Sequence, residues 1–421
     1  MDDLHLAHLS DTHFGREQFR ATTASGANQR GADIVHGARR AVSGILDADP
    51  PLVLHAGDVS DTTMPKLKYW FEAKRQFTQL AGLRADGTRR QLVICPGNHE
   101  QPADVTEPCW LDVFGDLPGV HVAGGSYDRI TFDDADNPPP ELADTVVHVI
   151  PHSGLAALAR DGKRGGAGFD QVRPVDGKRN ILMTHGVAEG SELFYRAIGK
   201  EHPVPGEVLR RDWDYVALGH YHKSGPVQPG SSVINEEKPS RVWYSGSPET
   251  ITLSDVEGRE TTERYWLDVV VRRGELPAVT RKPIAVRRIV YLPDVNADGL
   301  TQEQITAQLR TNLDAAAITE SVVVQKVLDV SPEVWATTDR RLVREAAEAS
   351  ALVYELRAVY KRGHPDVAER DHTVGMGDLP RLLGEGADAE GLTGEHREAV
   401  LAAARSHLDA ALAETVTSDD D

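Results

Sequence analysis

The feature that most constrains the fold is a series of short apolar segments of strand type, each ending at polar side chains able to bind a metal or carry a proton. The clearest is 92–95, Leu-Val-Ile-Cys, which is followed directly by Pro96-Gly97-Asn98-His99-Glu100. Gly97 lets the backbone turn sharply, so we expect Asn98 and His99 at the carboxyl end of a buried strand. Ligands collect at that edge of an open α/β sheet. This segment therefore predicts a ligand site.

Four more segments of the same kind end in candidate ligands. They are 4–9 before Asp11 and His13, 52–56 before Asp58, 180–183 before His185, and 215–218 before His220 and His222. The first three strands alternate with amphipathic helical patterns, which predicts an α/β core. Later strands at 145–150, 242–244 and 265–271 have few helices between them. We therefore predict an α/β fold of the α+β sandwich kind, with two sheets flanked by helices.

The pattern changes twice further along the chain. Strands at 289–292 and 322–330 and helices at 302–317 and 340–360 predict a small α+β domain. A segment rich in Gly, Asp and Pro then precedes a last apolar-striped helix at 395–413. The predicted divisions are 1–282, 283–362 and 363–421. The last helix has little of its own chain to pack against, so it docks either on a partner or on its own domain.

Composition limits the cellular setting more than the substrate. The net charge of −19 argues against a surface coated with nucleic acid, yet basic clusters in the N-terminal half leave DNA open as a substrate. No apolar run could span a bilayer, and the first strand begins too near Met1 to leave room for a signal peptide. The only two cysteines, Cys95 and Cys109, are expected to be reduced. We expect a cytoplasmic protein without membrane association.

The side chains at the strand ends combine carboxylate, amide and imidazole groups without cysteine. This set suits Mn²⁺, Fe or Zn²⁺ in a reactive centre more than a structural zinc site. The pairs Asp11/His13 and His220/His222 each place two side chains on one side of an extended segment. A carboxylate such as Asp58 can bridge two metals, and such a pair clamps a phosphoryl group and activates a bridging water as nucleophile.

Taken together, the five blocks resemble the calcineurin-like metallophosphoesterase superfamily, in order and with plausible spacing. The blocks are His8-Leu9-Ser10-Asp11-Thr12-His13-Phe14-Gly15, Gly57-Asp58, Gly97-Asn98-His99-Glu100, Thr184-His185-Gly186 and Gly219-His220-Tyr221-His222. The resemblance implies two divalent metal ions, with Mn²⁺ favoured and Fe or Zn²⁺ as alternatives. It implies Asp11, His13, Asp58 and His222 around one ion. The other would be held by Asp58, Asn98, His185 and His220, and His99 would be the catalytic histidine that is not a ligand.

Finer features resemble the SbcD-type DNA repair nucleases, which work with a coiled-coil ATPase of the SMC type. These features are Asp61-Thr62 with Pro65, and Tyr244-Ser245-Gly246-Ser247-Pro248-Glu249. The resemblance implies that 1–282 is the catalytic domain, 283–362 a capping domain that positions DNA, and 363–421 a linker with an ATPase-binding helix. It implies linear double-stranded ends or single strands as substrates. Asp61 replaces a histidine common in archaeal and eukaryotic relatives. His8 and Asp61 are candidates for supporting the ligands from behind.

Three functions remain open from the sequence. The first is an exo/endonuclease subunit of a double-strand-break repair complex. The second is a stand-alone phosphodiesterase or phosphatase that acts on a nucleotide or another small phosphoester. The third is a metal-containing scaffold without turnover, although no ligand position is lost. A helix after Pro65 with Leu67, Trp70, Phe71, Phe77 and Leu80 is interpreted as packing on the core, with a homodimer interface as the alternative.

Overall fold

The computed structural model describes residues 3–101, 108–189, 203–228, 234, 236–256 and 263–360. The described residues form two compact units. One contains 3–295, 302–326 and 338–357 within those ranges, and the other contains 296–301, 327–337 and 358–360. All the strand ends predicted to carry ligands belong to the first unit. The predicted linker and helix within 363–421 lie outside the described residues.

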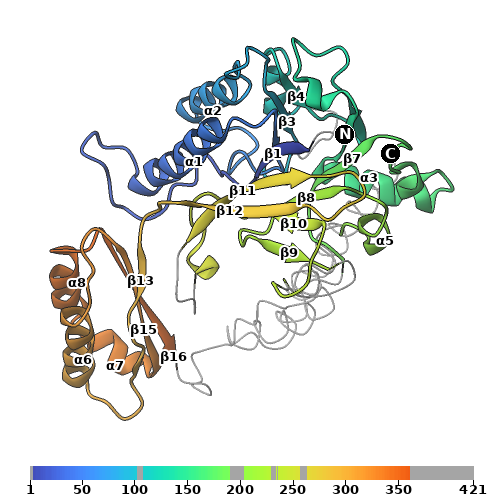
Figure 1. Cartoon of the computed structure of the whole chain (residues 1–421). Helices are drawn as coiled ribbons and strands as arrows, with labels where there is room; N and C mark the ends of the chain where they lie inside the picture. Colours follow the sequence, from blue (N-terminus) through green and yellow to red (C-terminus); the bar gives the residue numbers. More distant parts are fainter. Residues whose placement is uncertain are drawn as a thin grey trace, which may run out of the picture. The chain divides into compact units, whose positions relative to one another are not determined.

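The first of two large sheets has six strands in the order β12-β11-β1-β2-β3-β4 (Figure 1). Strands β1 to β4 are parallel, whereas β11 is antiparallel to β1 and β12 is antiparallel to β11. The strands are β1 (Leu4–Leu9), β2 (Leu52–His55), β3 (Gln91–Ile94), β4 (Val120–Val122), β11 (Arg264–Val271) and β12 (Ala278–Ile284). The carboxyl ends of β1, β2 and β3 therefore lie at one edge of this sheet.

The second sheet also has six strands, in the order β5-β6-β7-β8-β10-β9. Strands β6, β7, β8 and β10 are parallel, and antiparallel β5 and β9 form its edges. The strands are β5 (Asp128–Ile130), β6 (Thr145–Ile150), β7 (Arg179–His185), β8 (Tyr215–Gly219), β9 (Gly225–Val227) and β10 (Val242–Tyr244). Strands β7 and β8 supply the remaining predicted ligands.

The two sheets pack face to face through a shared apolar core. Leu6 and Leu54 of the first sheet lie in one buried cluster with Val149 and Tyr215 of the second. Because strand side chains alternate, Leu9 belongs instead to the cluster on the other face of the first sheet. The predicted sandwich of two sheets is confirmed.

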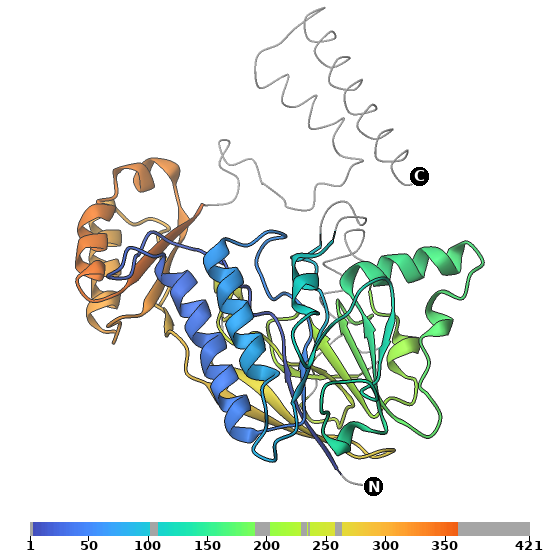
Figure 2. The ribbon, with the colours of Figure 1, turned by 90° about the horizontal axis from the view of Figure 1, so that it is seen from above.

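Helices cover both outer faces of this sandwich. Helices α1 (Gln29–Ala48) and α2 (Leu67–Leu80) lie side by side on the first sheet, as Figure 2 shows. Helices α3 (His152–Lys163) and α5 (Gly206–Leu209) pack on the second sheet. The Asn28 side chain accepts a hydrogen bond from Gly31 N at 3.0 Å, so α1 begins at Gln29. The α/β class and the flanking helices are confirmed.

A third, smaller sheet has the order β13-β15-β14, with β16 also paired to β15. The elements of this part of the chain are β13 (Ile289–Tyr291), β14 (Val295–Asn296), α6 (Gln302–Asp314), β15 (Val322–Val330), α7 (Pro332–Thr337), α8 (Arg340–Glu348) and β16 (Val353–Tyr360). The strand and helix content of the predicted α+β domain is thus present. The division of the chain at 283 and 362 stays a prediction.

The predicted helix over 340–360 is wrong in its second half. Helix α8 ends at Glu348, and β16 begins at Val353. Val343, Ala347 and Ala351 are buried at helical spacing, so the pattern continues past the end of α8, whereas the buried Tyr354 and Leu356 are two residues apart, as in a strand. The Tyr354 hydroxyl donates to Gln325 Oε1 of β15 at 2.6 Å, which helps to fix the strand pairing.

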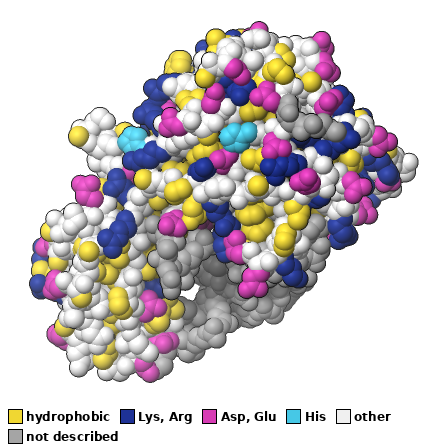
Figure 3. All heavy atoms as spheres, viewed as in Figure 1, with side chains coloured by type: hydrophobic (Ala, Val, Ile, Leu, Met, Phe, Trp, Pro, Cys, Tyr) yellow, Lys and Arg dark blue, Asp and Glu magenta, His cyan; other side chains and the backbone are white. Residues whose placement is uncertain are grey.

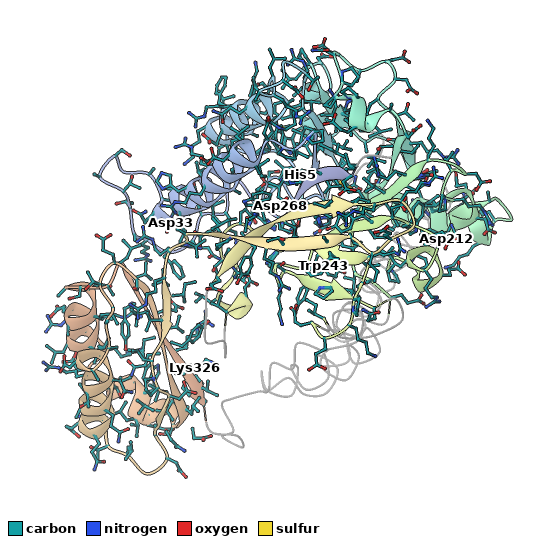
Figure 4. The ribbon with its side chains drawn as sticks, in the orientation of Figure 1. His5, Asp33, Asp212, Trp243, Asp268 and Lys326 are labelled. Atoms are coloured by element: carbon teal, nitrogen blue, oxygen red, sulfur yellow. The ribbon has the colours of Figure 1, made fainter. Side chains whose placement is uncertain are left out.

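The described surface carries both signs of charge. Acidic and basic side chains are interspersed over the face shown in Figure 3. In Figure 4, His5 of β1 and Asp268 of β11 lie close together, and their side chains form an ion pair. Asp33 of α1, also labelled in Figure 4, accepts hydrogen bonds from Arg287 Nε at 2.7 Å and from its Nη2 at 2.9 Å. Charged contacts therefore link neighbouring elements across this surface.

Two further expectations can be compared with the structure. Cys95 is buried, Cys109 is half-buried, and both are free thiols. Among the helices of the described ranges, none combines the length and apolar character needed to cross a bilayer.

Candidate dinuclear metal centre

The predicted ligands converge from both large sheets. Strands β1, β2 and β3 lead into Asp11 and His13, into Asp58, and into Asn98 and His99. His185 is the last residue of β7, and His220 directly follows β8. Strands β1, β2 and β3 are parallel to one another, and β7 is parallel to β8. The carboxyl ends of these five strands form one edge of the sandwich.

The backbone that carries these donors is strained. Asp11, His13, Asp58 and His220 have positive φ angles of 54°, 44°, 50° and 97°. Residues other than glycine rarely adopt this region, and such strain persists only where the surroundings enforce it. Asp11 N donates to Gly57 O at 2.8 Å and His13 N donates to Asp58 O at 3.0 Å, so the loops after β1 and β2 hold one another.

Gly97 is needed for a different reason from the one expected. Its φ is not among the positive angles, so the sharp turn does not require a glycine. A Cβ at this position would lie 2.2 Å from Asp58 Oδ1 and 2.4 Å from Asp58 N. The β3 loop can therefore approach Asp58 only through a residue without a side chain.

One group of donors, here called the Asp11 side, consists of Asp11, His13 and His222. His13 Nε2 lies 3.2 Å from His222 Nε2, and each of these atoms lies 4.0 Å from Asp11 Oδ1. Asp11 is fully buried and accepts a hydrogen bond from His220 N at 3.1 Å. These three side chains could hold one cation.

The second group, here called the Asn98 side, consists of Asn98, His185 and His220. Asn98 Oδ1 lies 3.0 Å from His185 Nε2 and 3.1 Å from His220 Nδ1. Asp58 lies between the two groups, because its Oδ2 is 3.5 Å from His13 Nε2 and 3.3 Å from His185 Nε2. One carboxylate oxygen is thus within reach of both sides, as the sequence-based assignment of a bridging residue requires.

The hydrogen bonds behind the imidazoles test whether these groups fit cations. His13 Nδ1 lies 3.2 Å from Asp61 Oδ1, and His222 Nδ1 lies 3.1 Å from Asp255 Oδ2. Carboxylates only accept, so both Nδ1 atoms carry protons, and neutral rings then direct lone pairs from their Nε2 atoms. Two lone pairs 3.2 Å apart repel each other unless a cation accepts both. The residues of the Asp11 side therefore fit a metal cation.

The electrostatics favour positive charge at the same place. Burial lowers the pKa of His185, but the adjacent Asp58 outweighs it and raises that pKa to about 10. Burial raises the pKa of Asp58, yet His185 and His13 hold it well below its usual range. Burial likewise raises the pKa of Asp255, and its contact with His222 lowers it again below the ordinary value. A field that retains a proton on His185 would also retain a metal cation.

His99 stands beside this pair of groups rather than within it. Its Nδ1 donates to the backbone carbonyl of Asp61 at 3.0 Å, which leaves Nε2 facing Asp58 Oδ2 at 4.0 Å. About a third of the His99 side chain, 34%, is exposed, whereas that of Asp58 is 2% exposed. A bound phosphoester could therefore contact the His99 imidazole.

Several contacting residues were not predicted as part of the site. Asp255 lies outside every block, and its only sequence signal is the capping pattern it forms with Thr252. Glu100 accepts from Ser60 N at 2.7 Å and from Gly97 N at 2.8 Å, and burial, reinforced by Asp58, raises its pKa to about 8. Glu100 therefore joins the loops after β2 and β3.

His152 was not among the site residues predicted from the sequence. Its ring stacks on His220 at 6.4 Å between centroids, and its Nδ1 donates to His185 O at 3.3 Å. A histidine two residues beyond the strand at 145–150 was the signal for this position. His8 shares a hydrogen bond with the hydroxyl of Tyr215, which is not a candidate ligand, at 2.9 Å. Its support of the ligands therefore stays a prediction.

The geometry of the site and a comparison with protein families together assign the chain to a family. A family model described as Calcineurin-like phosphoesterase matches residues 4–224, just over half of the 421 residues. The fold and the donor set define a metal-dependent phosphoesterase, and the chain belongs to the calcineurin-like phosphoesterase family. The family resemblance seen in the five sequence blocks is confirmed.

Among curated proteins, the chain is similar to archaeal proteins named DNA double-strand break repair protein Mre11. It is 22% identical over 305 residues to that of Sulfurisphaera tokodaii, covering 72% of this chain and 68% of that protein. It is 23% identical over 376 residues to that of Methanosarcina mazei, covering 86% and 51%. For Haloferax volcanii the identity is 25% over 261 residues, covering 60% and 47%. The chain thus spans only about half the length of the latter two relatives.

Two solved structures are similar at a lower level. A dimetal phosphatase from Danio rerio has 9% identity and a TM-score of 0.34, covering 66% of this chain and 99% of that one. The calcineurin-like phosphoesterase YfkN from Bacillus subtilis has 12% identity and a TM-score of 0.36, covering 74% and 97%. Similarity at this level carries no argument about activity.

Proposed function

We propose that this chain is a metal-dependent DNA exo/endonuclease that acts in double-strand-break repair. The observation that carries the proposal is Asp58 Oδ2, which lies 3.5 Å and 3.3 Å from imidazoles of the two donor groups. The similarity to Mre11 proteins of several archaea supports DNA as the substrate. We also propose that the protein works in the cytoplasm, which the free thiols of Cys95 and Cys109 support.

Asp11, His13 and His222 would hold one cation, Asn98, His185 and His220 the other, and Asp58 both. Mn²⁺ is the proposed metal because carboxylate, amide and imidazole donors suit it. When bound, such a pair supplies a clamp for the phosphoryl oxygens and an acidified water. The chain's own part is to fix the donors, and the strained loops after β1 and β2 do so before substrate arrives.

His99 is the proposed general acid. Because its Nδ1 is tied to the Asp61 carbonyl, only Nε2 is available to a substrate. A protonated Nε2 can donate to the leaving oxygen of a cleaved phosphodiester, and general acids of this kind contribute about 10²–10⁴-fold to the rate. His99→Ala should therefore reduce hydrolysis by that factor while leaving the cation donors in place.

The partners are also proposed. A coiled-coil SMC-like ATPase would bind the helix predicted at 395–413, which lies outside the described residues. Residues 283–362 would form the capping domain that positions DNA. Leu67 and Phe71 on α2 are 67% and 57% exposed, although the helix packs on the core through Phe77. This exposed apolar pair is a candidate homodimer interface.

The testing experiment compares three substrates with Mn²⁺ and with EDTA: linear double-stranded DNA, a single-stranded oligonucleotide and bis-p-nitrophenyl phosphate. We expect Mn²⁺-dependent cleavage of DNA that falls about 10²–10⁴-fold in His99→Ala. His36→Ala on α1 is the matched control, since His36 is exposed and distant in sequence from every donor. Hydrolysis of the small phosphodiester without any cleavage of DNA would favour the stand-alone phosphodiesterase instead.

A further inference from the structure

Next to the cation centre, the inner face of the sandwich changes from apolar to aromatic and cationic. Leu267 of β11 lies in the buried cluster between the two sheets. Tyr265 precedes it by two residues, and Arg281 of β12 is its pairing partner, so both side chains continue the same inner face. Because β11 runs antiparallel to β1, Tyr265 lies at the carboxyl end of β1, the end that leads into Asp11.

Tyr265 and Arg281 line a pocket of about 430 Å³. The other lining residues include Arg264 and the segments 222–224 and 245–247. His222 of the Asp11 side is therefore part of the wall, so the pocket borders one of the candidate ligands. Pockets that hold small molecules usually measure about 300–1,000 Å³, and the volume of this one lies within that range.

The loop after β10 fixes the pocket wall relative to the centre. Gly246 has a φ of 73°, and a Cβ there would lie 2.6 Å from Ser224 N, so the two wall segments meet through their backbones. Ser245 Oγ lies 2.7 Å from the Oγ of Ser10, which directly precedes Asp11. The pocket therefore keeps its position beside the donors before any ligand binds.

A buried guanidinium belongs to the same wall. Arg264 is 3% exposed, and its Nη1 donates to His222 O at 3.1 Å, whereas its Nη2 donates to Thr250 Oγ1 at 3.1 Å. Lys223, which also lines the pocket, is half-buried. Two cationic side chains thus stand in the wall next to His222, and both attract a phosphate group bound nearby.

Arg281 lies over two aromatic rings. Its guanidinium carbon is 5.4 Å from the ring centroid of Trp243, which Figure 4 labels on β10, and 5.9 Å from that of Tyr265. Its Nε donates to Ser224 Oγ at 3.1 Å, and its Nη2 donates to Glu236 Oε1 at 2.8 Å. The guanidinium is therefore fixed in place, yet 28% of the side chain is exposed, so a ligand can reach it.

A nucleotide matches this combination of groups. Its base has a flat π face, which stacks on tyrosine rings and on arginine guanidinium planes. Its phosphate is attracted to Lys223 and Arg264. A phosphoester with only small alkyl groups offers nothing flat to Tyr265 and Arg281, and a purely apolar ligand would take water from the charged walls without replacing its hydrogen bonds.

We infer that this pocket is a nucleoside subsite, which binds the base next to the phosphate at the centre by stacking on Tyr265 and Arg281. The inference rests on the proposed function, because that function places a phosphodiester at the centre. Stacking depends little on which base is present, so the subsite accepts different bases. A base can enter only after it has left the duplex, so the subsite favours single strands and opened duplex ends over paired DNA.

The test compares two phosphodiesters with the same leaving group. The p-nitrophenyl ester of thymidine 5′-monophosphate carries a nucleoside, and methyl p-nitrophenyl phosphate carries a methyl group in its place. With Mn²⁺, the full-length chain should have the higher kcat/KM for the thymidine ester. In Tyr265→Ala and in Arg281→Ala, the ratio of the two kcat/KM values should fall about 5–150-fold, mainly through the KM of the thymidine ester.

A second measurement depends on neither metal nor hydrolysis. Saturation-transfer NMR with EDTA present records contact between the protein and the base protons of deoxyadenosine. The parent should show transfer to these protons, and a short oligothymidylate should displace the nucleoside. Both alanine variants should lose the transfer, because they remove the groups on which the base stacks.

Two matched variants separate stacking from other effects. Tyr265→Phe keeps the ring and removes only the hydroxyl that contacts Glu263, so it should restore the ratio and the transfer lost in Tyr265→Ala. Lys282→Ala removes a cation beside Arg281, but Lys282 pairs with Trp266 of the outer-face cluster, so its side chain points away from the pocket and this variant should match the parent. Thermal unfolding shows whether each variant folds, and Arg281→Ala tests the subsite if Tyr265→Ala does not fold.

A parent without transfer to deoxyadenosine, or alanine variants that keep the parental ratio and transfer, would overturn the inference. Transfer that the oligothymidylate does not displace would assign the pocket to free nucleosides and would also overturn it. A parent without Mn²⁺-dependent hydrolysis of either ester would instead refute the proposed function, while the NMR measurement would still report whether the pocket binds a nucleoside.

Discussion

Replacing Gly97 with alanine should disable the centre without unfolding the protein. The new Cβ would meet Asp58 Oδ1 at 2.2 Å and Asp58 N at 2.4 Å, and the second of these atoms is backbone and cannot rotate away. Asp58 or the β3 loop must then move by about 1 Å to restore ordinary contact. Misplacement of that size costs about 10²-fold in rate, which is about 2.7 kcal/mol of transition-state stabilisation.

The assay is Mn²⁺-dependent hydrolysis of bis-p-nitrophenyl phosphate, with Mn²⁺ binding measured in parallel. Gly124→Ala is the control, because a Cβ there meets nothing within 4 Å and its φ is not positive. We expect the control to match the parent, and Gly97→Ala to lose both rate and cation affinity. If Gly97→Ala kept the parental rate and the parental cation affinity, the centre would tolerate a displaced Asp58. The claim that the β3 loop must approach Asp58 through a glycine would then be wrong.

Four further predictions follow from the structure. Burial lowers the pKa of His148 to about 4, so the folded state excludes a proton that the unfolded chain takes up below about pH 6.5. As the pH falls from 6.5 to 4, the free energy of unfolding measured with urea should therefore decrease by about 1.4 kcal/mol per pH unit more in the parent than in His148→Gln. The same dependence on pH in both proteins would contradict this. Mn²⁺ at about 100 times its Kd should stabilise the parent by about 2.7 kcal/mol in thermal unfolding, and Asp58→Asn should remove most of that shift. Phe71→Glu should turn any dimer seen by light scattering into a monomer, whereas a persisting dimer would place the interface elsewhere. Deleting everything after Gly391 should abolish pull-down of the coiled-coil ATPase and keep hydrolysis of bis-p-nitrophenyl phosphate; retained pull-down would exclude the terminal helix as the docking segment.

Sequence reasoning located the donors because parallel strands place their carboxyl ends together. Asp11, Asp58 and His185 each follow an apolar segment that could only be a buried strand, and the structure brings them to one edge. The family comparison independently confirms the class of enzyme. The sequence pattern could show which side chains follow each strand, and the parallel arrangement of the strands then places those side chains at the same edge of the sheets.

Asp61 was named from the family resemblance as a support of the ligands, but Asp255 and Glu100 could not be found from the sequence pattern. Asp255 reaches His222 from a short helical turn 33 positions along the chain, and Glu100 gains its role from two backbone N–H groups. Neither contact leaves a periodic trace in the sequence. The error at 340–360 has a similar cause: the helical spacing of buried residues continues from Ala347 to Ala351, beyond the end of α8, and only the pairing with β15 makes 353–360 a strand.

The strain at the donors and the close approach of the two sheets have a common origin. A Cβ on Gly219 would lie 1.8 Å from Ala56 O, so β8 of the second sheet meets the end of β2 of the first only because this position has no side chain. That contact brings His220 near Asp11, whose carboxylate accepts from His220 N at 3.1 Å. Neither sheet alone carries both donor groups, since His185 and His220 come from the second and Asp11, Asp58 and Asn98 from the first. The cation centre therefore depends on how closely the sheets pack at this one edge, and any change that separates them there should be detected first as lost metal affinity and only later as lost stability.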